Sequence, residues 1–346
     1  MVSQQTFGLP FQLPSNCSKS KFYMKRSRFY ITVGLILSLG FLLSACGQKK
    51  RKDGRTDTPT SGTIKFASDE SFSPIIEELL QNYQFRYPET HLLPIYTDDN
   101  KGMQLLLDQK VNLFFTSHAL TKGEDAMLRE KGPIPAVFPI GYDGIAFIVN
   151  NTNADSCITV TDVKKILSGQ IAKWNQLNPK NDKGNIEVVF DNKASATLHY
   201  VVDSILGGKN IKSANIVAAN NSKSVIDYVH KTPNAIGVIG SNWLNDHRDS
   251  TNTTFKKDIR VVGLSKTTVA QPENSWQPYQ AYLLDGRYPF VRTIYAIVAD
   301  PHKALLGHLQ TSLPIQLVRR LFLRLVSCLI VVKSTFVKLK LRPSSQ

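Results

Sequence analysis

Two short polar segments stand where an apolar run gives way to a helical pattern, and together they hold the residues Ser68, Asp69, Glu70, Ser71, Ser195, Ala196 and Thr197. Each segment places hydroxyl groups and unpaired backbone N–H groups at the start of a helix, where the helix dipole also favours negative charge. This set of donors predicts a site for an oxyanion. The same residue types are preferred as helix N-caps, and the local sequence alone favours simple capping.

Other catalytic patterns are missing from the sequence. It contains no G-x-x-x-x-G-K, H-E-x-x-H, C-x-x-C or G-x-S-x-G motif. The sequence therefore lacks the residues required for phosphate cleavage, for zinc binding and for a serine hydrolase. His118 and His199 lie near the polar segments, but a single histidine more often has a structural role. We expect no cofactor and no metal.

Leu43-Ser44-Ala45-Cys46 has the residue order of a bacterial lipobox. Five Lys or Arg residues precede an uncharged run over 29–45, which is the order of a secretory signal and its cleavage site. The thiol of Cys46 would carry the lipid, and Met24 is a better signal start than Met1. A buried or membrane-spanning helix is the alternative, but 17 apolar residues are at the lower limit for a span.

The net charge of +15 is carried by the two ends of the chain. Residues 1–60 hold 10 Lys or Arg against 2 Asp or Glu, residues 308–346 hold 7 against none, and residues 61–307 hold 25 against 25. The central region is therefore neutral, which argues against nucleic acid as a partner. The four cysteines show neither a disulfide framework nor metal-ligand spacing.

Apolar periodicity predicts the elements that must position the polar segments. We expect strands over 63–67, 91–96, 111–116, 144–150, 186–190 and 235–239, and helices over 75–86, 102–107, 124–131, 161–167, 195–206 and 222–230. The alternation of strands and helices predicts an α/β fold with a parallel sheet covered on both faces. A change of character after residue 150 predicts a second lobe, with a ligand cleft between the lobes.

Many short motifs occur in a specific order over about 245 residues. They are Asp69-Glu70-Ser71-Phe72-x-Pro74, Tyr87-Pro88, Thr116-Ser117-His118-Ala119-Leu120-Thr121, Asp143, Ile166-Leu167-Ser168-Gly169, Trp174, Val189-Phe190-Asp191, Ser195-Ala196-Thr197, Ala235-Ile236-Gly237-Val238 and Tyr288-Pro289. In this order the chain resembles the phosphate-binding substrate-binding proteins of ABC phosphate transporters, in particular a lipoprotein branch from Bacteroidetes.

The resemblance implies a periplasmic-binding-protein fold of type II, in which two lobes close on inorganic phosphate. Carried over residue by residue, it implies phosphate contacts from Ser68, Asp69, Glu70, Ser71, Thr116, Ser117, Asp143, Ser195, Ala196 and Thr197. Relatives often have Arg or Asp at the position of His118, Ser or Gly at that of Ala196, and Arg at that of His199. A carboxylate such as Asp69 or Asp143 would accept the proton that hydrogen phosphate carries and sulfate lacks.

The resemblance also implies an organisation and partners. We expect a signal peptide over 1–46, a flexible tether over 47–61, a two-lobed domain over 62–307 and a separate tail over 308–346. The protein is expected to be a lipid-anchored monomer on the periplasmic face of the envelope that delivers phosphate to an ABC permease. Alternative functions are a binder of another oxyanion, a surface adhesion lipoprotein, or a phosphatase on a similar frame.

The tail differs from the family pattern, because it is basic and holds no acidic residue. Reading its codons from the third base permits the terminal family motif Gly-Leu-Leu-Pro, which predicts a frameshift near residues 306–308. The rival interpretation is a basic amphipathic segment that binds membranes. Its longest charge-free apolar run, 325–332, is too short to span a bilayer.

Overall fold

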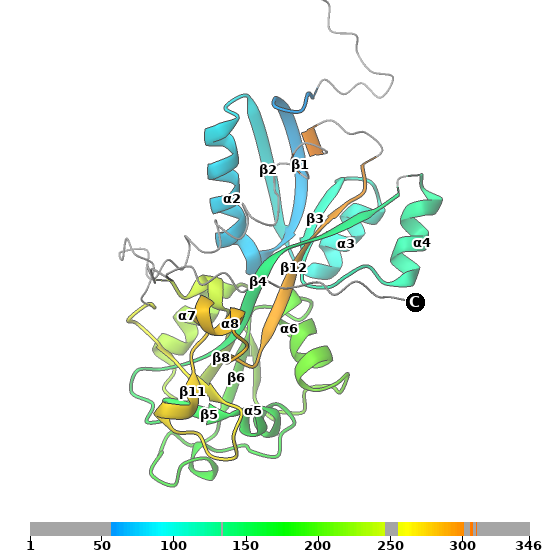
Figure 1. The fold of residues 1–346 in the computed structure, drawn as a ribbon. Helices are drawn as coiled ribbons and strands as arrows, with labels where there is room; N and C mark the ends of the chain where they lie inside the picture. Colours follow the sequence, from blue (N-terminus) through cyan, green and yellow to red (C-terminus); the bar gives the residue numbers. More distant parts are fainter. Residues whose placement is uncertain (1–56, 133, 246–254, 301–304, 307–308, 310–346) are drawn as a thin grey trace, which may run out of the picture. The chain divides into compact units, whose positions relative to one another are not determined.

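The computed structural model describes residues 57–132, 134–245, 255–300, 305, 306 and 309, and Figure 1 draws the fold. The expected signal segment with Cys46, most of the tether and almost all of the tail lie outside the described residues. None of the helices in the described part of the chain has both the length and the apolar character that crossing a bilayer requires.

Five strands form the first sheet: β1 Gly62–Asp69, β2 Thr90–Thr97, β3 Leu113–Thr116, β4 Ala136–Val149 and β12 Val291–Val298. Their order is β2-β1-β3-β12-β4. β1 runs parallel to β2 and β3, whereas β12 runs antiparallel to both β3 and β4. The prediction of a parallel sheet is correct for β1, β2 and β3, but the sheet as a whole is mixed, because β12 comes from a distant part of the chain and runs antiparallel to its neighbours.

β4 continues into a second sheet with β6 Glu187–Phe190, β7 Ile216–Ala218, β8 Ala235–Gly240 and β9 Arg260–Val261. The first part of β4 pairs with β12 and its last five residues pair with β8. A small third sheet contains β5 Cys157–Thr159, β10 Gly263–Ser265 and β11 Ser275–Trp276. We call residues 57–143 and 291–300 the first lobe and residues 144–290 the second lobe. The expected two-lobed α/β architecture is confirmed.

The helices cover both faces of the two main sheets (Figure 1). They are α2 Ser73–Arg86, α3 Asp99–Leu107, α4 Lys122–Glu130, α5 Val160–Leu167, α6 Ala196–Tyr200, α7 Ser222–Lys231 and α8 Gln280–Leu284. Short turns are η1 Glu70–Phe72, η2 Trp174–Gln176, η4 Ser241–Trp243, η5 Pro272–Asn274 and the π-helical turn η3 Val201–Ile205. In the first lobe, Phe66 of β1 packs with α2, while the next residue, Ala67, packs with α3 on the opposite face. In the second lobe, Val188 and Val189 of β6 likewise face α5 and α7.

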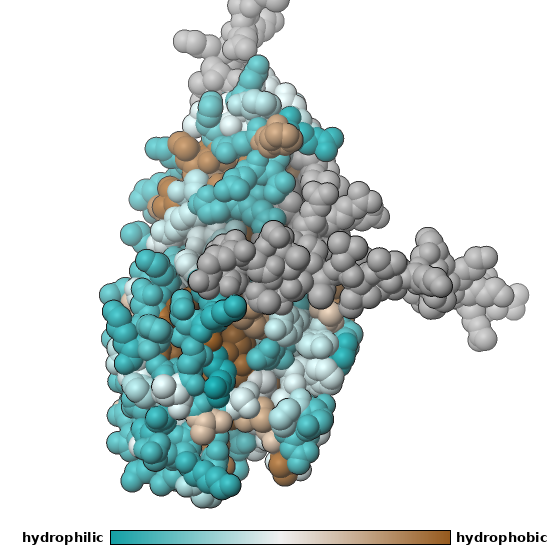
Figure 2. All heavy atoms as spheres, turned by 90° about the vertical axis from the view of Figure 1, so that its left-hand side faces the viewer, coloured by the Kyte–Doolittle hydropathy of each residue, from teal (hydrophilic) through white to brown (hydrophobic). Residues whose placement is uncertain are grey.

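α2 shows why these residues form these elements. Pro74 stands in its first turn, where the missing N–H costs no hydrogen bond. The apolar residues at helical spacing, Ile75, Ile76, Leu79, Leu80 and Tyr83, are all buried, and the helix ends before Tyr87-Pro88 as expected. The outward face is polar apart from isolated residues such as Phe85, and the surface in Figure 2 is mainly hydrophilic with separate hydrophobic patches.

Candidate functional site

Most of the predicted site residues lie at the junction of the two lobes. Among them, Ser68, Asp69, Ser71, Thr116, Asp143, Ser195, Ala196 and Thr197 are buried, whereas Glu70 and Ser117 are half-buried. The first lobe contributes the end of β1 and the turn η1, and the second lobe contributes the start of α6. Chain segments more than 120 residues apart thus meet at one place.

Asp69 connects the two polar segments directly. Its Oδ1 accepts a hydrogen bond from the backbone N–H of Ser71 at 2.9 Å, which caps η1. Its Oδ2 accepts from the backbone N–H of Ala196 in the other lobe at 3.0 Å. Burial, followed by the negative charges of Asp99 and Asp191, raises the pKa of Asp69 to about 7. The carboxyl therefore exchanges its proton near neutral pH.

Arg292 is a buried residue of this junction that the sequence did not point to. It is the only Lys or Arg in the buried set of the described residues, at 1% exposure. Its Nε and Nη2 donate to Oδ2 of Asp143 at 3.0 and 2.8 Å, and its guanidinium lies over the ring of Phe72. Nη2 also lies 3.2 Å from Oγ of Ser71, and Nη1 lies 3.4 Å from Oγ1 of Thr197. A full positive charge therefore stands among the hydroxyls of both polar segments.

The capping that the local sequence favours occurs in both polar segments, since Asp69 caps η1 and Ser195 caps α6. Ser195 caps α6, because its Oγ accepts from the N–H of Leu198 at 3.1 Å while its hydroxyl donates to Asp191. Glu70 reaches into the second lobe, where its Oε2 accepts from the N–H of Ser222 at 3.1 Å and from the Ser222 hydroxyl at 2.8 Å. Glu70 thus contacts the first residue of α7, outside the cluster around Arg292.

A second ionic cluster lies on the side of α3. Asp99, which the sequence reasoning did not single out, accepts from the hydroxyl of Thr116 at 2.6 Å. Its Oδ2 lies 2.9 Å from Nδ1 of His118 and 3.2 Å from Nδ1 of His199. Burial acts to raise the pKa of Asp99, but the hydrogen bonds from the two histidines outweigh it and hold that pKa below its usual value. Ser117 follows Thr116 in the bend after β3.

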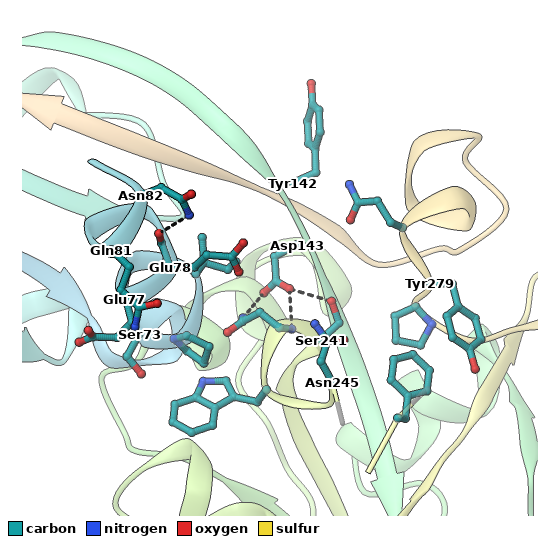
Figure 3. Close-up of a pocket in the computed structure, with 17 residues that line it drawn as sticks. Ser73, Glu77, Glu78, Gln81, Asn82, Tyr142, Asp143, Ser241, Asn245 and Tyr279 are labelled. Carbon is teal, nitrogen blue, oxygen red and sulfur yellow. Dashed lines mark hydrogen bonds between the residues drawn. The ribbon is translucent and has the colours of Figure 1, made fainter. Parts of the chain in front are cut away.

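A cavity of about 680 Å³ adjoins the junction on the side of α2 (Figure 3). Asp143, Ser241 and Asn242 form part of its wall. None of the described residues that line it is basic, and Glu77 and Glu78 of α2 add negative charge. This wall is unsuited to an anion, whereas the Arg292 guanidinium, which is bonded to Asp143, offers positive charge.

The lobes are held together by further polar contacts at this wall. Nδ2 of Asn242 and Nε1 of Trp243 both donate to the backbone carbonyl of Ser71, at 3.0 and 3.1 Å. Asp143 accepts from the hydroxyl of Ser241 at 2.8 Å and from Nδ2 of Asn242 at 3.1 Å. Asp143 is therefore fixed from both lobes, and it in turn fixes the guanidinium of Arg292.

Two lobes that share a long strand and enclose a buried charged cluster at their junction define an α/β ligand-binding protein. A family model described as the PBP superfamily domain matches residues 53–313, and the chain belongs to that superfamily. The fold class implied by the sequence resemblance is thereby confirmed.

Individual relatives agree with this assignment. The phosphate-binding protein PstS of Staphylococcus saprophyticus is 23% identical over 274 residues, which are 79% of each chain. A structure from Clostridium perfringens, solved with bound phosphate, covers 72% of this chain and 92% of its own, with a TM-score of 0.59 and 17% identity. An ABC-type phosphate transport receptor from Vibrio cholerae covers 76% and 97%, with a TM-score of 0.55 and 19% identity. At these identities the structural likenesses establish the fold.

Proposed function

We propose that the chain is the substrate-binding protein of an ABC transporter and that it captures inorganic phosphate at the junction of its lobes. The observation that carries this proposal is the buried guanidinium of Arg292, within 3.4 Å of the hydroxyls of Ser71 and Thr197. An oxyanion at this place would receive charge-assisted hydrogen bonds from Arg292 together with the hydroxyl and backbone donors of both lobes. The names of the relatives, which are phosphate-binding and phosphate-transport proteins, support the choice of ligand.

Asp69 is proposed to distinguish phosphate from sulfate. A carboxylate at the site would accept the proton of hydrogen phosphate, whereas sulfate has no proton to donate and would be repelled. The position of Asp69 supports this role, because both of its oxygens already face donors at the lobe junction. Because burial raises the pKa of Asp69 to about 7, the carboxylate form that accepts the phosphate proton and repels sulfate is the main form only above neutral pH.

A phosphatase reaction is less well supported by the geometry. A phosphatase would need a hydroxyl nucleophile beside a histidine base, and Thr116 and His118 are in such contact. However, the same ring nitrogen of His118, Nδ1, contacts both Oγ1 of Thr116 and Oδ2 of Asp99. A nucleophile, base and orienting acid need opposite nitrogens of the imidazole, one toward each partner. Among the described residues, no group of His, Cys, Asp or Glu is arranged to hold a metal ion. We therefore propose a binding protein that performs no covalent chemistry.

Calorimetric titration with phosphate and with sulfate tests the proposal. We expect saturable binding of phosphate and a much weaker response to sulfate, with Asp69→Asn reducing the difference between the two anions. Equal affinities for phosphate and sulfate in the unaltered protein would favour a general oxyanion binder. Release of phosphate from an ester such as p-nitrophenyl phosphate would favour the enzyme instead.

The location of this receptor is proposed from the sequence. We propose that residues before Cys46 are removed, that the Cys46 thiol carries the lipid, and that residues 47–61 tether a monomeric two-lobed domain outside the cytoplasm. The permease would then be reached by a receptor held at the membrane surface. For the tail, we propose a frameshift near residues 306–308, and a single reproducible reading frame across those codons would refute it.

A further inference from the structure

The carboxylate of Asp99 bridges the two lobes through contacts that do not involve Arg292. His118 approaches its Oδ2 from the same lobe, whereas His199 approaches the same oxygen from α6 of the second lobe. The backbone N–H of Asp99 also donates across the junction, to the carbonyl of Ala194 at 3.1 Å. The Asp99 side chain is 2% exposed, so its charge is shielded from water while the lobes are joined.

A buried carboxylate stays ionised only where hydrogen bonds or a positive charge compensate for its burial, and His118, His199 and Thr116 do this for Asp99. The hydrogen bond to Asp99 raises the pKa of His199 and of His118, more than their partial burial lowers it. If the lobes separate, His118 stays beside Asp99 because both belong to the first lobe. The contact between His199 and Asp99 is the one that is broken. The pKa of His199 then loses the interaction that raises it.

The other charged groups around the two histidines are few. On its own side, His199 faces Asp203 of η3, and its neighbour His118 acts to lower its pKa when both are charged. Nε2 of His118 lies 3.7 Å from a carboxylate oxygen of Glu124 on α4. The charge of Asp69 also interacts with that of Asp99. Asp99 is thus the group that both histidines share.

We propose that His199 is a positioning residue that couples closure of the lobes, and thereby affinity for the anion, to pH through its contact with Asp99. The sign follows from linkage: the pKa of His199 is higher with the lobes joined than apart, so protonation stabilises the joined arrangement. The stabilisation is present at low pH and is lost as the pH rises through the raised pKa. The proposal rests on the proposed function for its effect on affinity.

Three versions of residue 199 separate this mechanism from other titrations. His199→Arg keeps a positive charge at every pH, and His199→Gln has none. Phosphate itself and Asp69 also change charge near neutral pH, but they do so equally in all three proteins. The quantity of interest is therefore the ratio of the dissociation constants of variant and unaltered protein, measured at about pH 5.5 and about pH 8.5. His230→Gln, on the exposed end of α7, is the matched control.

We expect the unaltered protein to bind phosphate about three to ten times more tightly than His199→Gln at the lower pH, and nearly equally at the higher pH. His199→Arg should bind phosphate more tightly than His199→Gln at both pH values. The control should follow the unaltered protein throughout. A ratio between the unaltered protein and His199→Gln that does not change with pH would overturn the proposal.

A second readout needs no ligand. The radius of gyration of the ligand-free protein, measured by small-angle X-ray scattering, should be smaller at about pH 5.5 than at about pH 8.5. It should stay small for His199→Arg and large for His199→Gln. If no variant binds phosphate but the radius follows this pattern, the proposed function fails and the coupling stands. If phosphate binds but neither affinity ratio nor radius depends on residue 199, the coupling is refuted alone.

Discussion

Replacing Arg292 with methionine tests the centre of the proposed site. The change removes a buried guanidinium whose Nε and Nη2 both bind Asp143, and it leaves that carboxylate buried without a cation. Breaking a buried ion pair in this way costs roughly 3–5 kcal/mol of unfolding free energy. Loss of the charge-assisted hydrogen bonds to phosphate should cost a further 1.5–3 kcal/mol or so in binding, which is roughly 10- to 150-fold in Kd.

The double variant Asp143→Asn with Arg292→Met separates the two effects. It removes both charges of the Asp143–Arg292 pair, so most of the lost stability should return, while phosphate binding should remain as weak as in Arg292→Met. Chemical denaturation gives the stabilities and calorimetry the affinities. Arg129→Met, which alters an exposed ion pair on α4, is the control and should match the unaltered protein in both. The reasoning is refuted if Arg292→Met keeps the affinity of the unaltered protein, or if the double variant regains it.

Three further changes test separate parts of the account. Burial raises the pKa of Asp69 in the folded protein to about 7, so the native carboxyl holds its proton more tightly than the unfolded one. The unaltered protein should therefore lose stability as the pH rises toward 7, and Asp69→Asn should abolish this loss. Denaturation between about pH 4 and pH 8 should show a divergence from the unaltered protein of up to about 4 kcal/mol, and parallel curves would contradict this cause. Glu70→Ala removes the acceptor of two hydrogen bonds from the buried Ser222 across the junction, so phosphate affinity should fall roughly tenfold and the melting temperature should fall as well, because two buried donors lose their acceptor. If affinity is unaltered, that contact is absent from the phosphate-bound state. Cys46→Ser should eliminate incorporation of labelled palmitate in cells and release the protein from the membrane, and persistent labelling would place the lipid elsewhere.

The elements that sequence patterns predict well are those whose signals are local. β1 and α2 follow from a short apolar run, a proline in the first helical turn and apolar residues at helical spacing, and all three features act within a few residues. The helix expected over 195–206 was only partly correct, because it changes to a π-helical turn at Val201. Apolar spacing cannot distinguish these two hydrogen-bond patterns over one turn.

Local sequence signals of this kind do not predict the pairing of β12 or the position of Arg292. The strand is defined by pairing with β3 and β4, and Arg292 stands directly opposite Asp143, which precedes it by 149 residues. An arginine within an apolar strand has no partner that can be recognised from its neighbours in sequence. The start of β4 was missed for a related reason, because Pro139 and half-buried residues weaken its pattern before Gly144.

The acidic residues beside the proposed anion site have a common physical role. In the arrangement described here, the N–H of Ala196 is bound by Asp69, and the N–H of Ser222 is bound by Glu70. Carboxylates of the first lobe thus occupy donors of the second lobe, as an anionic ligand would. Under the proposed function, phosphate binding at Ala196 would replace one anion with another, and it would favour a ligand whose own proton lets Asp69 remain as an acceptor. A site made only of cations would attract any anion, whereas a site with a carboxylate among its donors selects an anion that carries a proton.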